Sequence, residues 1–564
     1  MNKSLLLFFI INLYFSFYTK AQDLQLQVTG NNEIETKIID SVSYNKYHKD
    51  FSSIKAEVDS LKNKFLRIGY LNSFIQNINK ENDSVFNATL YLKKKYNNLH
   101  IKYDENITPK SILKSITKNI DDGYFVIPIE ATEETLSHIN LKLSENGQPF
   151  NRIKLSNIII NKDNVEASLF VSEKQKTRTI DKIIVKGYER FPKSYLKYFF
   201  KIKTEDIFNL SAIKKKTLKF ENLKFANQLK DPEVLFTEDS TTLYLYIDKI
   251  KSNSFDGFLG FGTNEETSKL EFNGYLNLSL LNNLNYGERL NIIYKSDEND
   301  QKTFNANINI PYLFGSPIGT EAELNIFKKD STFSTVNQNI YINYQLNTKN
   351  KLSLGVNTTQ SENLLSEQNS IASIKDYSKT LYSLRYEYIK IKSNNRLFPV
   401  KSLFDIEVGT GKREFERISE NQTQVSFNTF NIFELNSKNS AYIRLNGFNL
   451  FSNTFLENEL IRFGGINSIR GFEENSLTAS LFGLINTEYR YTLSNSIYIH
   501  SIIDFSYFEN KLINQKEKLY GFGLGFGILT KAGLLKFNYA NGKSENQKFK
   551  LSNSQIHLSL SAVF

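Results

Sequence analysis

The chain has 564 residues, of which 40% are hydrophobic and 23% are charged, and its formal net charge is +10. No internal segment approaches the roughly 20 apolar residues of a membrane-spanning helix, which excludes a polytopic helical membrane protein. The absence of Cys excludes disulfides, thiolate metal sites and cysteine nucleophiles. The 45 Phe and 31 Tyr are many for a chain whose mean hydropathy is −0.38, and they need an explanation.

The N-terminus has the three parts of an export signal. Residues 1–3 form a short basic start, residues 5–18 form an apolar core, and Ala21 ends a small-residue cleavage pattern. This order of segments is typical of a secretory signal peptide. We therefore expect residues 1–21 to be removed on export, and a buried N-terminal helix is the alternative.

The positive charge does not indicate a nucleic-acid partner. Residues 251–564 are close to neutral, and the excess of Lys and Arg is spread thinly over residues 1–250. A nucleic-acid-binding surface would need a clustered basic patch or an aromatic–basic signature, and neither pattern occurs. No nucleic-acid partner is expected.

Helical and strand patterns alternate before residue 250. In Phe51–Tyr70 the apolar residues recur at spacings of three and four, as on one helix face, and Gly69 then ends the helix. Two strand patterns follow, and comparable units recur around Glu133–Leu143 and after Ile180. The repeat, a strand followed by helices and two strands, predicts three α+β domains at 22–103, 104–175 and 176–250.

This arrangement resembles POTRA domains, periplasmic modules that bind client polypeptides by adding a strand to a sheet edge. Two short motifs carry the resemblance, Leu66–Tyr70 and Val185–Tyr188. It implies that free backbone groups on an edge strand recruit an extended peptide irrespective of the peptide's sequence. Simple tandem α+β domains are the alternative.

From residue 251 onward the sequence pattern has a period of two. Ile340 and Ile342, for example, alternate with Tyr341 and Asn343, and the polar face is rich in Asn, Ser, Thr and Gln. The pattern predicts about sixteen strands of about ten residues in a transmembrane β-barrel, with lipid outside and a polar lumen inside. A soluble all-β domain is the alternative. The predicted strands begin near residues 254, 269, 288, 301, 320, 335, 349, 380, 397, 424, 440, 480, 495, 519, 534 and 552.

A sharp motif lies between the eleventh and twelfth predicted strands. It contains Gly464, Gly465, Arg470, Gly471 and Phe472. The motif closely resembles the sixth-loop motif of the outer-membrane assembly and two-partner-secretion transporter superfamily (BamA, TamA and FhaC types). The resemblance implies that this loop folds back into the barrel and that its Arg pairs with an acidic residue on the wall.

Strand parity identifies candidate wall partners. With Ile503 and Phe505 facing lipid, Asp504 faces the lumen on the thirteenth strand, and the same argument turns Glu488 inward on the twelfth. We expect Arg470 to pair with Asp504 and to be shared with Glu488. The alternative is an extracellular loop whose Arg meets only solvent. Four glycines of the fourteenth strand should face inward and clear space for the loop: Gly521, Gly523, Gly525 and Gly527.

No catalytic residue, metal site or cofactor is expected. The five His residues show no metal-ligand spacing, and Gly409–Arg413 lacks the spacing of a phosphate-binding loop. Phe564 ends an alternating strand and resembles the C-terminal signal by which outer-membrane barrels are recognised for insertion. Because the sequence shows no metal-ligand, phosphate-loop or catalytic pattern, an enzyme is not expected.

The resemblance implies a function in the outer membrane of a Gram-negative bacterium. Tandem α+β POTRA-like domains in the periplasm would capture unfolded or partly folded client proteins, and a 16-stranded barrel over residues 251–564 would assist their insertion or passage. The implied partners are client polypeptides and outer-membrane lipid, with an inner-membrane or periplasmic partner protein left open. The alternatives are a two-partner-secretion transporter for one cognate exoprotein and a passive porin-like channel. The client's identity and lateral opening of the barrel stay open.

Overall fold

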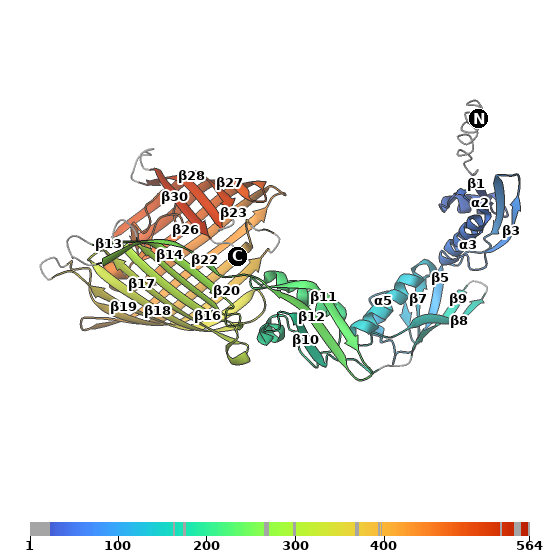
Figure 1. Ribbon diagram of the computed structural model, residues 1–564, viewed down its shortest axis with the longest axis horizontal. Helices are drawn as coiled ribbons and strands as arrows, with labels where there is room; N and C mark the ends of the chain where they lie inside the picture. The colour runs from blue at the N-terminus through green and yellow to red at the C-terminus, as the bar shows by residue number, and fades with distance from the viewer. Residues whose placement is uncertain are drawn as a thin grey trace, which may run out of the picture. The chain divides into compact units, whose positions relative to one another are not determined.

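The computed structural model describes residues 23–161, 164–172, 176–263, 270–296, 301–366, 371–392, 395, 397–530, 533–545 and 554–561. The predicted signal peptide and Phe564 lie outside these residues. The chain divides into two compact units, Met1–Thr179 with Ile207–Ser211 and Ile180–Asp206 with Ala212–Phe564 (Figure 1). Within the described ranges, no helix is long and apolar enough to cross a membrane.

Three small sheets precede the large one, and they share one topology. In each, the first strand lies parallel to the last, and the last pairs antiparallel with the strand before it. The internal repeat predicted from the sequence is therefore present. The three sets of strands are β1 (Leu24–Thr29), β3 (Phe74–Lys80) and β4 (Val85–Tyr91); β5 (Asn98–Lys102), β8 (Ile153–Asn161) and β9 (Asn164–Val171); and β10 (Lys182–Gly187), β11 (Ala226–Phe236) and β12 (Thr241–Lys249). The short strands β2 (Tyr47–His48), β6 (Ile120–Asp121) and β7 (Tyr124–Pro128) extend the first two sheets.

Helices pack on these sheets through the predicted apolar faces. In α3 (Phe51–Arg67) the buried residues recur at spacings of three and four, and Asp50 caps the helix by accepting a hydrogen bond from Ser53 N at 2.7 Å. Gly69 adopts φ = +106°, as a left-handed cap requires. The other helical segments are α2 (Glu33–Ser41), α4 (Lys110–Leu113), α5 (Thr132–Glu145), α6 (Leu210–Thr217), the 3₁₀ turns Ile129–Ala131 and Leu218–Asn222, and the π-helical turn Tyr195–Phe199.

One predicted domain border differs from the border in the structure. A border at residue 103 assigns β5 to the first domain, but β5 pairs with β7 and β9 of the second sheet. The border therefore lies between Tyr91 and Asn98. The five residues of β5 are too few to carry a pattern of their own, and their parallel partners in β9 lie 66 positions further on in the sequence, as the pair Leu99 and Val165 shows.

The C-terminal region forms an antiparallel sheet of sixteen strands, which Figure 1 shows rolled into a barrel. Neighbours in the sheet are also neighbours in sequence, except that β23 pairs with β26 because the intervening loop contains the separate hairpin β24–β25. The predicted fold class is confirmed. The barrel strands are β13 (Ser254–Thr263), β14 (Leu270–Leu281), β15 (Arg289–Ser296), β16 (Gln301–Ile310), β17 (Ile318–Lys329), β18 (Phe333–Gln345), β19 (Asn350–Asn363), β20 (Tyr377–Ile391), β21 (Val400–Phe415), β22 (Ile418–Glu434), β23 (Asn439–Phe451), β26 (Leu481–Ser494), β27 (Ile497–Asn510), β28 (Gln515–Leu529), β29 (Leu534–Ser544) and β30 (Ser554–Ser561).

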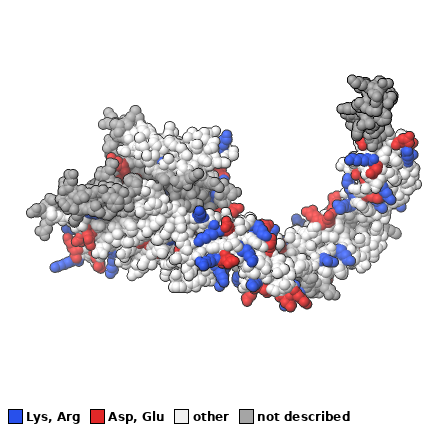
Figure 2. Space-filling model, in the orientation of Figure 1, with Lys and Arg blue, Asp and Glu red and all other residues white. Residues whose placement is uncertain are grey.

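The faces of the barrel follow the alternating pattern. Ile340 and Ile342 are 59% and 61% exposed on the outer face, whereas Tyr341 and Asn343 are buried on the inner face. Figure 2 shows few charged side chains on the flank of the barrel and more of them toward its ends. An apolar flank between charged rims is what a lipid-facing band requires, and it accounts for the many exposed aromatic and aliphatic side chains.

Tyrosines of the third α+β domain pack on turns of the barrel. The Tyr198 hydroxyl donates to the Gly315 carbonyl oxygen at 2.9 Å in the β16–β17 turn. Tyr195 meets Tyr312 of the same turn edge-on, with ring centroids 5.0 Å apart. In the β14–β15 turn, the Tyr195 ring occupies the space that a Cβ on Gly287 would need. These turns define the domain-side end of the barrel, and the β23–β26 loop starts from the opposite end.

Candidate functional site

The loop between β23 and β26 packs inside the barrel. Its hairpin, β24 (Ile461–Phe463) and β25 (Leu477–Ala479), contributes Phe463, which stacks on Phe482 of the wall with ring centroids 4.9 Å apart. Ile469 is fully buried in the same apolar cluster, and Phe472 packs against it. The wall residues of this cluster come from four strands and comprise Phe448, Leu450, Phe482, Leu484, Phe508 and Leu519.

Arg470 connects the loop tip to two carboxylates of the wall. Its Nε donates to Asp504 Oδ2 at 2.8 Å and its Nη2 to Asp504 Oδ1 at 2.5 Å, which is a bidentate pair. Its backbone N–H also donates to Asp504 Oδ2, at 3.0 Å. The remaining Nη1 donates to Glu488 Oε1 at 2.5 Å. The structure thus brings Arg470, Asp504 and Glu488 together, and both Arg470 and Asp504 are buried.

A second guanidinium, that of Arg490 on β26, completes this network. Arg490 Nε donates to Glu488 Oε2 at 2.7 Å, so two arginines face the carboxylates of Asp504 and Glu488. The Arg490 guanidinium also lies over the rings of Tyr442 and Phe398, at 4.1 and 4.7 Å from their centroids. A buried pair is stable only when its charges and hydrogen-bonding groups are matched, and this network meets that condition.

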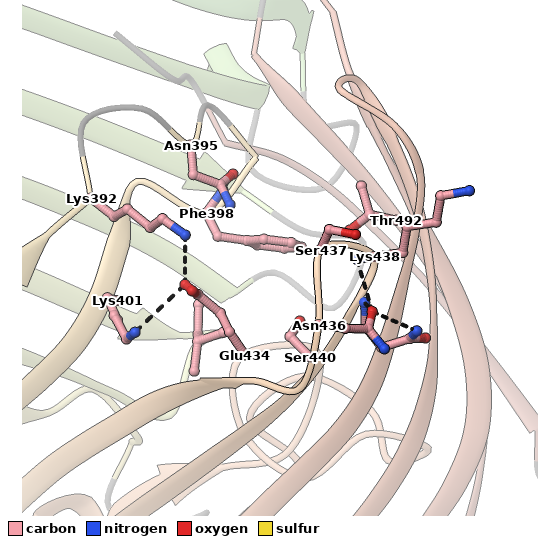
Figure 3. A pocket seen from close by; sticks show the side chains of 12 residues that line it. Lys392, Asn395, Phe398, Lys401, Glu434, Asn436, Ser437, Lys438, Ser440 and Thr492 are labelled. Atoms are coloured by element: carbon pink, nitrogen blue, oxygen red, sulfur yellow. Dashed lines mark hydrogen bonds and ion pairs between the residues drawn. The ribbon is translucent and has the colours of Figure 1, made fainter. Parts of the chain in front are cut away.

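The turn between β20 and β21 reaches the network from the domain side. Phe398 contacts the inward-facing Tyr498 of β27 with ring centroids 4.8 Å apart, and Leu397 is buried beside it. At the base of the turn, Lys392 and Lys401 both pair with Glu434 (Figure 3). Sequence reasoning did not identify Phe398 as a lumenal residue. The sequence feature that could have indicated it is the run Leu397-Phe398-Pro399, which stands inside an otherwise polar turn.

Three glycines of the motif adopt left-handed backbone conformations. The φ angles are +115° at Gly464, +94° at Gly465 and +91° at Gly471. A Cβ at Gly464 would stand against the Glu473 carbonyl oxygen, and one at Gly471 would stand against the backbone of β29 near Gly542. Both the conformation and the close approach require glycine at these positions.

Replacing Gly471 with Ala should therefore loosen the tip. A left-handed backbone costs a residue with a Cβ about 1–2 kcal/mol, and the collision with β29 adds to this cost. We expect faster tryptic cleavage of the loop after Arg462 or Arg470 in the purified barrel. Gly483→Ala is the matched control, because no atom lies within 4 Å of a Cβ built there. Equal resistance of the Gly471→Ala variant and the parent would contradict the expectation.

The inward glycines of β28 serve different neighbours. A Cβ at Gly521 would collide with the Arg470 carbonyl oxygen, so this glycine does clear space for the loop. The other three lie against the wall itself. At those positions a Cβ would meet the β29 backbone (Gly523), His500 and Asn538 (Gly525), or the Tyr498 ring (Gly527). The expectation that all four accommodate the loop is therefore wrong, because inward side chains of adjacent strands fill most of that space. Gly542, which sequence reasoning missed, accommodates the loop at Gly471.

Hydrogen bonds to the loop backbone add to the ion pairs. Asn486 Nδ2 donates to the Ser468 carbonyl oxygen at 2.9 Å, and Arg444 Nη1 donates to the Asn467 carbonyl oxygen at 2.7 Å. Gly471 N donates to His557 Nε2 at 3.1 Å on the last strand. No cluster of His, Asp and Glu in the described part of the chain could hold a metal ion. The site is a docking site for the loop.

Comparison with known proteins identifies the family. A family model described as the Omp85 superfamily domain matches residues 277–564, just over half of the chain. The fold is similar to BamA from Haemophilus ducreyi lacking POTRA domains 1–3, with a TM-score of 0.52 and 15% identity over 81% of this chain and 97% of that chain. CdiB from Escherichia coli is similar with a TM-score of 0.51 and 12% identity over 90% of this chain and 97% of that chain. No curated protein sequence matches significantly. From the match over residues 277–564, the chain belongs to the Omp85 superfamily.

Proposed function

We propose that this protein is an outer-membrane assembly or translocation factor of a Gram-negative bacterium. Its α+β domains lie in the periplasm and capture unfolded or partly folded polypeptides, and its barrel assists their insertion into the membrane or their passage across it. The observation that carries the proposal is the loop docked by Arg470 inside a 16-stranded barrel of the Omp85 superfamily. In this proposal the protein has no enzymatic role, and the use of the site to bind a segment of the chain itself supports that view.

The β8 edge of the second sheet is the best candidate for client capture. It is the terminal strand of the order β6-β7-β5-β9-β8, and its consecutive Ile158, Ile159 and Ile160 are 60%, 51% and 37% exposed. Asn157, with φ = +52°, lies in an irregularity of the ladder that turns these side chains toward solvent. Proteins normally protect an edge strand with charges, so an apolar edge fits an extended, hydrophobic client.

Photo-crosslinking in cells tests client capture. A photoreactive amino acid at Ile159 is expected to yield adducts with outer-membrane polypeptides that are still being assembled. The matched control is the same amino acid at Leu141, an equally apolar residue on α5 that is 47% exposed but not on a sheet edge. Adducts of equal yield and identity at both positions would show that the edge has no special role.

A two-partner-secretion transporter is the second candidate function. The TM-score to CdiB is close to that for BamA, so the fold supports either one. The crosslinking experiment separates the two, because an assembly factor yields many different membrane proteins and a secretion transporter yields one exoprotein. A passive porin is disfavoured, because the docked loop occupies the lumen.

We also propose that the barrel opens between its first and last strands. The sheet order begins at β13 and ends at β30, and no backbone ladder joins these strands within their described residues. A client strand could pair there before the barrel releases it sideways into the membrane.

A further inference from the structure

A second group of buried charges holds the loop at the end of the barrel away from the third domain. Arg413 of β21 is fully buried. Its Nη2 donates to Glu420 Oε2 of β22 at 2.6 Å, and its Nη1 donates to a Glu459 carboxylate oxygen. Nη2 also donates to Thr454 Oγ1 at 2.5 Å. Glu459 and Thr454 belong to the segment that leads from β23 into the lumen, so one arginine joins this segment to the wall.

The wall carboxylate of Glu420 holds the backbone of the same segment. It accepts hydrogen bonds from Asn453 N, from Thr454 N at 3.1 Å and from Thr454 Oγ1 at 2.6 Å. Ser452 Oγ donates to it as well, at 3.0 Å. Five donors from Arg413 and these three loop residues therefore converge on one side chain, which fixes the path of residues 452–454.

Contacts to β19, β20 and the segment between them extend this attachment. Lys379 Nζ of β20 lies 3.7 Å from Glu459 Oε1, and both side chains are buried. Asn458 Nδ2 donates to Ser361 Oγ at 2.9 Å and to the Lys375 carbonyl oxygen at 2.8 Å. Two cations, Arg413 and Lys379, thus face two carboxylates, so the cluster is matched in charge as the Arg470 network is.

From this geometry we infer that Arg413 is a positioning residue for the docked loop. It fixes the segment entering the lumen, so that the tip presents Arg470 to Asp504 and the loop closes the bore at the end away from the third domain. Without Arg413, Glu420 would lose its ion-pair partner and Glu459 would keep Lys379, 3.7 Å away. A buried carboxylate that loses its cation strongly favours release of the segment. The inference rests on the proposed function only in assuming that client handling needs a docked loop.

Ion conductance of the full-length protein in planar bilayers tests the inference without any client. Arg413→Gln is expected to raise the steady conductance several-fold and to lower complementation of a deletion strain. Arg417→Gln is the matched control, because Arg417 is exposed in the same β21–β22 hairpin. An Arg413→Gln barrel with parental conductance would overturn the inference. Because this readout needs no client, it decides the inference even if the crosslinking experiment fails.

A disulfide keeps the test valid if Arg413→Gln alone does not fold. The chain has no Cys, so Ser361→Cys and Asn458→Cys can form only one intramolecular pair, at a point where the two native side chains are hydrogen-bonded. In an Arg413→Gln background the oxidised protein is expected to show parental conductance, and reduction of the folded barrel is expected to raise it. A conductance that stays low after reduction would show that Arg413 does not hold the loop.

Discussion

Replacing Arg470 with Ala is expected to abolish complementation of a strain lacking this protein, while the barrel still inserts into the membrane. The substitution removes the three side-chain hydrogen bonds to Asp504 and Glu488 and leaves Asp504 buried without a cation. Breaking a buried pair in this way costs about 3–5 kcal/mol. Since about 1.4 kcal/mol corresponds to a tenfold change, the docked tip should become at least roughly a hundredfold less populated.

Complementation and the heat-modifiable mobility of the folded barrel measure this effect separately. Arg470→Lys keeps the charge but loses the bidentate geometry, so we expect partial activity from it. Arg417→Ala serves as the control for loss of an exposed arginine, and it should complement fully. Full complementation by Arg470→Ala would remove the docked loop from the mechanism.

A disulfide across the seam between β13 and β30 is expected to stop client release almost completely. Cysteines are introduced in pairs, one within residues 254–257 and one within residues 556–559, until a pair crosslinks. Oxidation then joins the two terminal strands of the sheet order and prevents sideways opening. Added reductant should restore the activity, because the chain contains no other Cys.

The control for this experiment is a crosslink inside the sheet. Ser279 of β14 and Asn291 of β15 are register partners whose side chains are hydrogen-bonded at 2.8 Å. A disulfide at these two positions ties strands that are already paired, so it should leave the activity unchanged. Unchanged activity with the seam crosslinked would rule out lateral opening as a necessary step.

The barrel strands could be predicted from the sequence because each of them has one face toward lipid and one face toward the polar lumen. Lipid outside and a polar lumen inside impose a period of two, and strands such as β13 and β29 begin at the predicted residues, Ser254 and Leu534. β22 begins at Ile418, six residues before the predicted start at 424. Its first residues include Ser419, Glu420 and Asn421, which are polar on both faces, so no alternation marks them.

The docking site was only partly accessible to the same reasoning. The alternation of side chains along the strands predicts that Asp504 and Glu488 face the lumen. The resemblance of the loop motif to a known family identifies Arg470. The pairs Arg413–Glu459 and Arg490–Phe398 join a wall strand to a folded loop or turn, and neither parity nor spacing encodes which residues meet there. The tertiary path of those segments determines these contacts.

The tyrosine contacts of the third domain and the arginine contacts of the loop fall on different strands of the barrel. Tyr195 and Tyr198 contact the turns that follow β14 and β16, whereas the ion pairs of Arg413 and Arg470 hold the loop to β21, β22, β26 and β27. A rotation of the domain therefore acts first on the turns at the ends of β14 and β16, outside the group of strands that the two arginines join to the loop. Movement of the domain is thereby transmitted to the barrel on the side of its first strand, β13.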